Sequence, residues 1–266
     1  MSVLLQISDP HFGTEQPPVC EALVRLHRSL DPDLVVLSGD ITQRARRAQF
    51  DAARAFVDRL APRAFLAIPG NHDIPLFDVA TRLVAPYRGY VRVFGETLEP
   101  VFESAGLLVC GVNTTRWWRH ADGEVSAAQV ERVGARFRAA RPEQLRVAVV
   151  HQPIDPTDVE NLLHGAGPAA RAWAEAGCDL VLGGHIHLPY VVPLTARHAP
   201  MARPVWAVQA GTAVSSRVRD GKPNSVNVVR HTPGEPCRVE RWDHDAAKAA
   251  FVRVETTEIR LLRKAH

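Results

Sequence analysis

The chain has 266 residues, of which 46% are apolar, so it can bury a sizeable core in one large domain or two small ones. No apolar run is long enough to cross a bilayer and the first residues lack the basic start of a signal peptide, so we expect a cytoplasmic protein without membrane insertion. A net charge of +3 without a dense basic run argues against nucleic acid as a main partner, and four scattered cysteines fit free thiols in a reducing compartment.

Strand and helix patterns alternate through the first two-thirds of the chain. β-rich apolar runs predict buried strands, and apolar residues at helical spacing predict the helices between them. The sequence predicts strands at 3–8, 34–39, 64–70, 107–114, 145–153 and 178–185, and helices at 17–30, 45–60 and 126–140. Alternation of this kind is typical of parallel βαβ units in an α/β fold.

The pattern changes beyond residue 187 to short strands broken by proline, glycine and asparagine. These strands are predicted at 190–194, 204–211, 225–231 and 237–244, without a helix of comparable strength between them. We expect residues 188–245 to complete a second, mainly antiparallel sheet. Since no polar linker separates this part from the rest, the sequence predicts a single domain over residues 1–266.

Ligand-type side chains follow five of the predicted strands at their carboxyl ends. In α/β sheets this edge is where ligands bind, and five such strand ends make ordinary loop residues a poor explanation. A mixed carboxylate, amide and imidazole set of this size exceeds what one zinc ion binds, and it suits two divalent transition metals that share one carboxylate. The residues are Asp9, His11, Asp40, Asn71, His151, His185 and His187.

The last two of these histidines stand one residue apart in "GGHIH". If the extended backbone of the preceding strand continues through the glycines, His185 and His187 project to the same side. Two imidazoles held together suit metal binding or a proton relay.

The motifs "SDPH", "GDIT", "IPGNHD", "HQP" and "GGHIH" occur in the order seen in the calcineurin-like metallophosphoesterases, and the chain resembles that family. The stretches "VNTT…DGEVSAAQVERV" and "QAGTAVSSRVRDGKPNSVNVV" further resemble its bacterial cyclic-nucleotide phosphodiesterase branch (class III). The resemblance implies a four-layer α/β/β/α sandwich with a dinuclear metal centre. It also implies a metal-dependent phosphoric ester hydrolase.

The resemblance assigns the ligand-type residues to two divalent ions, for which Mn, Fe or Zn is expected. Asp40 would bridge them. The first ion would be held by Asp9, His11, Asp40 and His187, and the second by Asp40, Asn71, His151 and His185.

The implied reaction is hydrolysis of a phosphodiester, a cyclic nucleotide or a related small diester, by in-line attack of a metal-bridging hydroxide. His72 is left out of the ligand set and lies next to Asn71 in the sequence. It would donate a proton to the leaving oxygen, or stabilise the phosphoryl charge as a cation.

The chain departs from the wider family at two positions. Phosphoprotein phosphatases carry an aspartate three residues after the bridging one, and here that residue is Gln43. A neutral amide does not stabilise an imidazolium as a carboxylate does, so Asp73 is the alternative group that orients His72. Many relatives have a second histidine where this chain has Gln152. Both changes favour a phosphodiesterase over a protein phosphatase.

Other functions remain open at this point. A nucleotide or lipid pyrophosphatase or a nuclease would use the same fold, although the sequence lacks the basic groove that a nuclease needs. A non-catalytic binding scaffold is the alternative from another class. The loop with Trp117 and Trp118 would either stack a nucleobase or pack against itself. We expect a small phosphodiester substrate as partner, and the sequence leaves open whether the chain forms a homo-oligomer.

Overall fold

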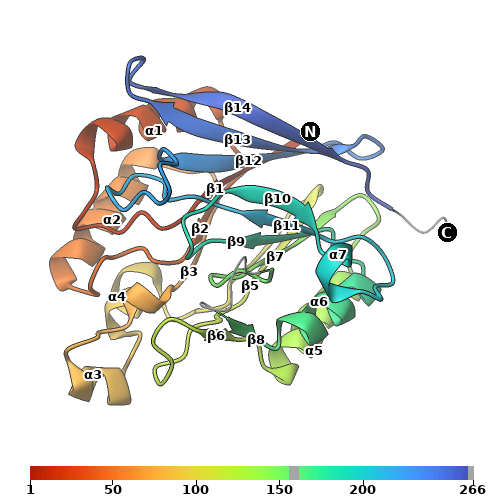
Figure 1. The fold of residues 1–266 in the computed structure, drawn as a ribbon, viewed down its shortest axis with the longest axis horizontal. Coiled ribbons are helices and arrows are strands. Elements are labelled where there is room, and N and C mark those ends of the chain that lie inside the picture. Colours follow the sequence, from red (N-terminus) through yellow and green to blue (C-terminus); the bar gives the residue numbers. More distant parts are fainter. Residues whose placement is uncertain (156–161, 263–266) are drawn as a thin grey trace.

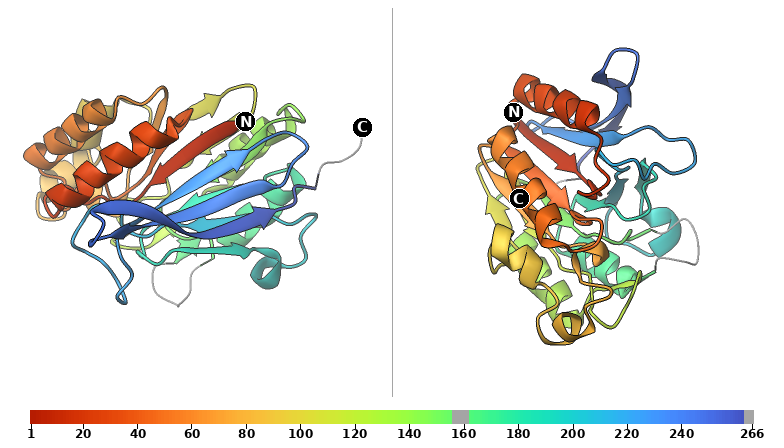
Figure 2. Two further views of the ribbon diagram at one scale, coloured as in Figure 1. Left: turned by 90° about the horizontal axis from the view of Figure 1, so that it is seen from above. Right: turned by 90° about the vertical axis from the view of Figure 1, so that its left-hand side faces the viewer.

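Two six-stranded sheets lie at the centre of the computed structural model, which describes residues 1–155 and 162–262 (Figure 1). In the first sheet β1, β2 and β3 are parallel, whereas β12, β13 and β14 are antiparallel to their neighbours. β1 therefore lies beside β12, from near the other end of the chain (Figure 2). The order of this sheet is β14 (Ala250–Ile259), β13 (Cys237–Asp245), β12 (Ser225–His231), β1 (Ser2–Ile7), β2 (Leu34–Ser38) and β3 (Phe65–Ile68).

The second sheet has a parallel centre and antiparallel edges. β11, β9, β7 and β5 run parallel, and β10 and β4 close the two edges in the antiparallel direction. Its order is β10 (Tyr190–Pro193), β11 (Trp206–Gln209), β9 (Leu180–Gly183), β7 (Leu145–Val149), β5 (Leu107–Gly111) and β4 (Val101–Glu103). A separate short pair joins β6 (Gly123–Glu124) to β8 (Leu163–His164).

Helices cover the outer face of each sheet. Figure 1 shows the first two helices at one side of the molecule, and α5 and α6 at the opposite side. The first sheet is covered by α1 (Pro17–Leu30), α2 (Arg47–Leu60) and α4 (Arg88–Phe94), and the second by α5 (Ala127–Arg138) and α6 (Ala166–Glu175). The short helices are the 3₁₀ turn η1 (Asn71–Asp73), α3 (Val79–Val84) and α7 (Thr195–His198).

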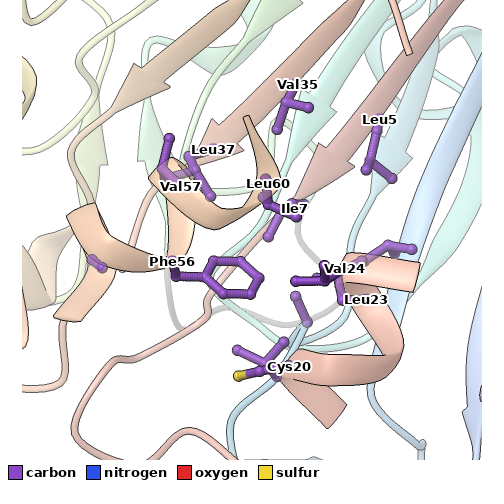
Figure 3. Packing of buried hydrophobic residues seen from close by; sticks show 14 of the residues in the cluster. Leu5, Ile7, Cys20, Leu23, Val24, Val35, Leu37, Phe56, Val57 and Leu60 are labelled. Atoms are coloured by element: carbon purple, nitrogen blue, oxygen red, sulfur yellow. The ribbon is translucent and has the colours of Figure 1, made fainter. Parts of the chain in front are cut away.

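Three apolar clusters follow from the alternation of side chains along the strands. Leu5 of β1 faces α1 and α2, in the cluster drawn in Figure 3, whereas Leu4 faces the second sheet. Both side chains are fully buried, and burial of a leucine contributes about 1.5–3 kcal/mol to folding. Trp173 of α6 belongs to the third cluster, on the outer face of the second sheet. Helix, sheet, sheet and helix layers thus confirm the predicted four-layer α/β/β/α sandwich.

The strands beyond residue 187 divide between the two sheets, so the predicted allocation of residues 188–245 to one mainly antiparallel sheet is wrong. β10 and β11 extend the second sheet, whereas β12 and β13 join the first. β14 also continues the first sheet beyond residue 245. A short apolar run predicts that a strand forms. It does not predict the neighbouring strand, which depends on which sheet has an unpaired edge within reach. We keep the single domain over residues 1–266 as a proposal, supported by the core that both sheets share.

Helices α3, α4 and α6 are additions to the predicted elements. α3 and α4 have only six and seven residues, too few for a clear apolar stripe. α6 has the sequence AGPAARAWAE, in which glycine and proline obscure the helical pattern. No helix in residues 1–155 or 162–262 combines the length and apolar character needed to cross a membrane.

Candidate metal centre

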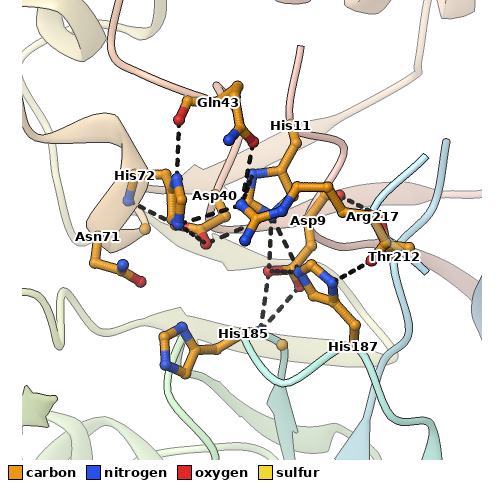
Figure 4. A network of polar contacts seen from close by, with 12 residues as sticks. Asp9, His11, Asp40, Gln43, Asn71, His72, His185, His187, Thr212 and Arg217 are labelled. Carbon is orange, nitrogen blue, oxygen red and sulfur yellow. Dashed lines mark hydrogen bonds and ion pairs between the residues drawn. The ribbon is translucent and has the colours of Figure 1, made fainter. Parts of the chain in front are cut away.

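The ligand-type residues meet where the parallel strands of both sheets end. Asp9 and His11 follow β1, Asp40 follows β2, and Asn71 and His72 form the 3₁₀ turn after β3. The second sheet supplies the other three, His151 after β7 and His185 and His187 after β9. Figure 4 shows side chains from both sheets turned toward one another.

The backbone at this edge is left-handed at five of these residues. This region is uncommon for residues other than glycine, and each such residue costs on the order of 1–3 kcal/mol. Strain of this kind persists where the surrounding structure holds it, and it is concentrated at functional sites. The residues and their φ angles are Asp9 (50°), His11 (44°), Asp40 (45°), His185 (73°) and His187 (58°).

These angles overturn the expectation of an extended backbone through His185 and His187. The chain turns at both residues, so the two imidazoles reach different neighbours. His187 lies with Asp9 and His11, whereas His185 lies with Asp40 and His151. The turn also explains Gly184, since a Cβ there would overlap Ser8 Oγ and the carboxylate of Asp9.

Asp9, His11 and His187 form the first cluster of candidate ligand atoms. The Nε2 atoms of the two histidines are 3.0 Å apart, and His187 Nε2 lies 3.4 Å from Asp9 Oδ1. Asp40 approaches the same cluster, with Oδ2 3.6 Å from His11 Nε2. These nitrogen and oxygen atoms converge closely enough to hold one ion.

Asp40, His151 and His185 form the second cluster. His151 Nε2 lies 3.1 Å from Asp40 Oδ1 and 3.1 Å from the side-chain oxygen of Asn71. The two carboxylate oxygens of Asp40 therefore face different clusters, Oδ2 toward His11 and Oδ1 toward His151. This is the arrangement that a shared carboxylate between two ions needs.

Backbone carbonyls hold two of the imidazoles in position. His151 Nδ1 donates to Ser38 O at 3.0 Å, and His187 Nδ1 donates to Arg217 O at 2.6 Å. A carbonyl can only accept, so the proton lies on Nδ1 and Nε2 faces the cluster, as in metal-binding histidines generally. Asp9 is held in turn by Ser8 Oγ at 2.6 Å and by the backbone N–H of His185.

The site keeps both carboxylates charged despite complete burial. Burial acts to raise the pKa of Asp9, but hydrogen bonding and charge from His187 lower it to about 2. For Asp40 the charge of His151 outweighs burial and holds the pKa well below its usual range. Buried carboxylates that stay ionised are the ligand form that divalent cations require.

The imidazoles divide into two kinds. Burial lowers the pKa of His11 to about 3 and that of His185 to about 4, so both are neutral at pH 7 and offer a lone pair. Burial also acts to lower the pKa of His151, but the charge and hydrogen bond of Asp40 raise it to about 9. A metal ion on His151 therefore displaces a proton when it binds.

His72 lies beside the two clusters, and the backbone of Gln43 orients its ring. Its Nδ1 donates to the backbone oxygen of Gln43 at 2.9 Å, and its Nε2 lies 4.0 Å from Asp40 Oδ2. The side chain of His72 is 21% exposed, in contrast to the fully buried ring of His151. Nε2 is thus the nitrogen of His72 that a bound molecule can reach.

Asp73 does not orient His72, so that alternative is wrong. Its buried carboxylate accepts the backbone N–H groups of Ile41 at 3.0 Å, Thr42 at 2.8 Å and Gly70 at 2.9 Å. Burial, with the charge of Asp40, raises the pKa of Asp73 to about 6. Asp73 therefore ties the loop after β2 to the loop after β3, which carry Asp40 and Asn71.

The two glutamines that depart from the wider family have different surroundings. The side-chain oxygen of Gln43 accepts from Arg217 at 3.1 Å, at the mouth of the site. Gln152 is buried, accepts from Thr114 Oγ1 at 2.6 Å and donates to Ala121 O at 3.1 Å. Gln152 therefore supports the loop packing rather than the clusters.

Arg217 is a site residue that the sequence analysis misses. Its guanidinium NH1 lies 3.1 Å from Gln43 Oε1, 3.3 Å from His72 Nε2 and 3.4 Å from His11 Nδ1 (Figure 4). The loop between β11 and β12 carries it, far along the chain from every other site residue. The one signal for it in the sequence is its place in the stretch "QAGTAVSSRVRDGKPNSVNVV".

The tryptophan loop packs partly against itself. The rings of Trp117 and Trp118 meet edge to face with centroids 5.5 Å apart, and they are 37% and 56% exposed. His120 of the same loop lines a small cavity together with Asn71 and His72. The loop thus borders the site through His120.

The calcineurin-like phosphoesterase family model matches residues 2–189. The chain is also similar to a probable cyclic nucleotide phosphodiesterase from Synechococcus sp. (strain ATCC 27144 / PCC 6301 / SAUG 1402/1). They share 24% identity over 204 residues, which cover 71% of this chain and 74% of the relative.

Two solved structures share the fold. A dimetal phosphatase from Danio rerio superposes with a TM-score of 0.69 at 13% identity, over 98% of this chain and 99% of that one. A purple acid phosphatase from yellow lupin seeds superposes with a TM-score of 0.66 at 11% identity, over 97% of this chain and 53% of that one.

Proposed function

Because this chain belongs to the calcineurin-like phosphoesterase family, and is a metal-dependent phosphoric ester hydrolase, we propose that it hydrolyses a small phosphodiester. The observation that carries the proposal is a pair of carboxylate–imidazole clusters, with the carboxylate of Asp40 in one and within 3.6 Å of His11 in the other. Cyclic nucleotides are the first substrates to test, since the Synechococcus relative is named a probable cyclic nucleotide phosphodiesterase.

We propose that the two clusters hold two divalent ions, Mn, Fe or Zn. The donor set fits them, because imidazole nitrogens and carboxylate oxygens are ligands that these ions share. Asp9, His11, Asp40 and His187 would hold the first ion, and Asp40, Asn71, His151 and His185 the second. When bound, the ions activate water as a nucleophile and neutralise charge on the phosphoryl group.

His72 is proposed as the proton donor to the leaving oxygen. Arg217 has only donors, so where its NH1 faces His72 Nε2 at 3.3 Å, that nitrogen presents its lone pair. A phosphate oxygen that accepts from Arg217 would draw the guanidinium away and leave Nε2 free to take a proton from water, which His72 would then give to the leaving oxygen. The backbone carbonyl of Gln43 keeps the His72 ring oriented while the guanidinium moves, because it accepts from the other ring nitrogen, Nδ1.

Arg217 is proposed to bind a non-bridging oxygen of the scissile phosphate. The side-chain oxygen of Gln43 and Nε2 of His72 accept from its guanidinium at the site mouth, and an anionic phosphate is a stronger acceptor than either of these. Its backbone carbonyl separately positions His187, so the side chain can be replaced without removing that contact.

The proposed function predicts two metal ions per chain and metal-dependent cleavage of bis(p-nitrophenyl) phosphate. Metal analysis after loading with Mn²⁺, Fe²⁺ or Zn²⁺ measures the first, and steady-state kinetics with cyclic nucleotides and nucleotide pyrophosphates as competing substrates measures the second. Full activity with a single tightly bound ion would overturn the dinuclear site. A metal-loaded protein inactive on every ester would instead indicate a binding scaffold.

Arg217→Gln is expected to lower kcat/KM for bis(p-nitrophenyl) phosphate by about 10- to 100-fold, the effect of losing a charged hydrogen bond of about 1.5–3 kcal/mol. Metal content is expected to stay at the wild-type level, and Arg217→Lys is expected to recover part of the activity. Kinetics and elemental analysis of both variants provide the test. Loss of a metal ion in Arg217→Gln would show that the side chain supports the ligands rather than the substrate.

A further inference from the structure

A groove lined by five arginines lies beside the candidate metal centre. Its volume is about 460 Å³, and α2, α3 and α4 border it. The small cavity lined by Asn71 and His72 shares Arg44 and Leu76 with the groove, so the two are neighbours. The arginines are Arg44, Arg46, Arg47, Arg88 and Arg92.

Two of the arginines, Arg46 and Arg47, stand where the local electrostatics disfavour them. The N-terminus of a helix carries partial positive charge and favours acidic residues. The first turn of α2 contains no acidic residue, and it begins with Arg46 as N-cap and Arg47 as the first helical residue. Natural proteins that depart from a local preference, such as acidic residues at a helix N-terminus, are expected to do so at functional sites. An anion in the groove would be attracted both by the arginines and by this helix end.

Few carboxylates neutralise the groove. Asp51 pairs with Arg92 at 2.7 Å and approaches Arg47 at 3.9 Å. Asp78 lines the groove and caps α3 by accepting from Thr81 N at 3.0 Å, and its charge also acts on Arg88 from beyond ion-pair distance. Over residues 1–155 and 162–262, no carboxylate lies within ion-pair distance of three of the arginines. These are Arg44, Arg46 and Arg88, all exposed.

The groove also has an aromatic wall. Phe77 is 81% exposed, and the guanidinium of Arg44 lies over its ring at 5.8 Å from the centroid. A volume of this size is typical of sites for small molecules, not of a track along duplex nucleic acid. Guanidinium groups bind phosphate through paired hydrogen bonds, which makes phosphate the anion that this cluster suits best.

We propose that the groove binds a second phosphate group of the substrate. The substrate would be a small phosphodiester with a further phosphate on one ester arm, so that the scissile group lies at the metal centre and the second group among the arginines. This inference rests on the proposed function and narrows its substrate class.

The test compares two nucleotides that differ by one phosphate, adenosine 3′,5′-bisphosphate and adenosine 5′-monophosphate. Both are used as competitive inhibitors of bis(p-nitrophenyl) phosphate hydrolysis by the metal-loaded full-length chain. The inhibition constant of the bisphosphate is expected to be lower than that of the monophosphate by about tenfold or more. A charged hydrogen bond to the second phosphate is strong enough to give this difference. The double variant Arg46→Gln/Arg88→Gln is expected to lose this preference and to keep kcat/KM for bis(p-nitrophenyl) phosphate within about twofold of wild type, since neither residue touches the metal centre.

Arg54→Gln is the matched control, because it makes the same change on an exposed arginine of α2 outside the groove. It is expected to keep the preference. Equal affinity of the wild type for the two nucleotides, or a preference that survives in the double variant, would overturn the groove proposal. Calorimetric titration with the same nucleotides measures the two affinities without any turnover. The groove proposal and the proposed function are therefore tested separately, because only failure of the proposed function abolishes diester hydrolysis.

Discussion

Asp40→Asn is expected to weaken the binding of both metal ions, most strongly in the cluster that faces the amide NH₂, and to abolish hydrolysis. The side chain keeps its size, but its charge is lost and one of the two oxygens becomes an NH₂ group that cannot bind a cation. Because Oδ2 faces His11 and Oδ1 faces His151, either orientation of the amide leaves one cluster without its oxygen. An oxygen turned toward His72 N would keep the 2.8 Å hydrogen bond there, so the loop can retain its conformation.

Metal analysis of Asp40→Asn beside two other variants measures this effect. His187→Ala is expected to weaken mainly the first ion, because His187 lies only in that cluster, and Asp58→Asn on the exposed face of α2 is expected to bind metal like the wild type. Asp40→Asn that still binds two ions with wild-type affinity would refute the bridging role of Asp40.

His72→Ala is expected to lower kcat by roughly two to four orders of magnitude, the usual contribution of a positioned acid, with both metal ions retained. The loss is expected to depend on the leaving group. A nitrophenolate departs without a proton, whereas an alkyl or ribose oxygen needs one. The kcat of the variant on bis(p-nitrophenyl) phosphate should therefore fall less than its kcat on a cyclic nucleotide or an alkyl diester.

Two other outcomes would assign His72 differently. His72 Nε2 lies close to the ligand atoms of His11 and Asp40, so loss of a metal ion in His72→Ala would place the residue in the ligand set. Equal losses on aryl and alkyl esters would instead favour stabilisation of phosphoryl charge. Elemental analysis and the pair of substrates distinguish these cases in one preparation.

The parallel βαβ units and the position of the site were accessible from the residue pattern for a physical reason, whereas the four-layer arrangement was implied by the family resemblance. Strand and helix formation depend mainly on local apolar periodicity, which is clear in most elements up to residue 185 but not in α3, α4 and α6. Parallel strands joined by helices bring their carboxyl ends to one edge of a sheet, so Asp9, Asp40 and Asn71 had to converge once each was placed after a strand. Their division between two ions came from the family resemblance, because spacing carries no information about which side chains share a neighbour.

Tertiary contacts decided the rest. The left-handed turns at His185 and His187 accompany contacts of both residues with Asp9, which lies far away in the sequence. Arg217 enters the site from a loop without periodicity, and the arginine groove joins residues 44–47 to residues 88–92. The sequence by itself determined the elements and the ligand types, since these follow from local chemistry. Only the folded structure decided which distant residues meet, because such contacts depend on sheet order and loop conformation.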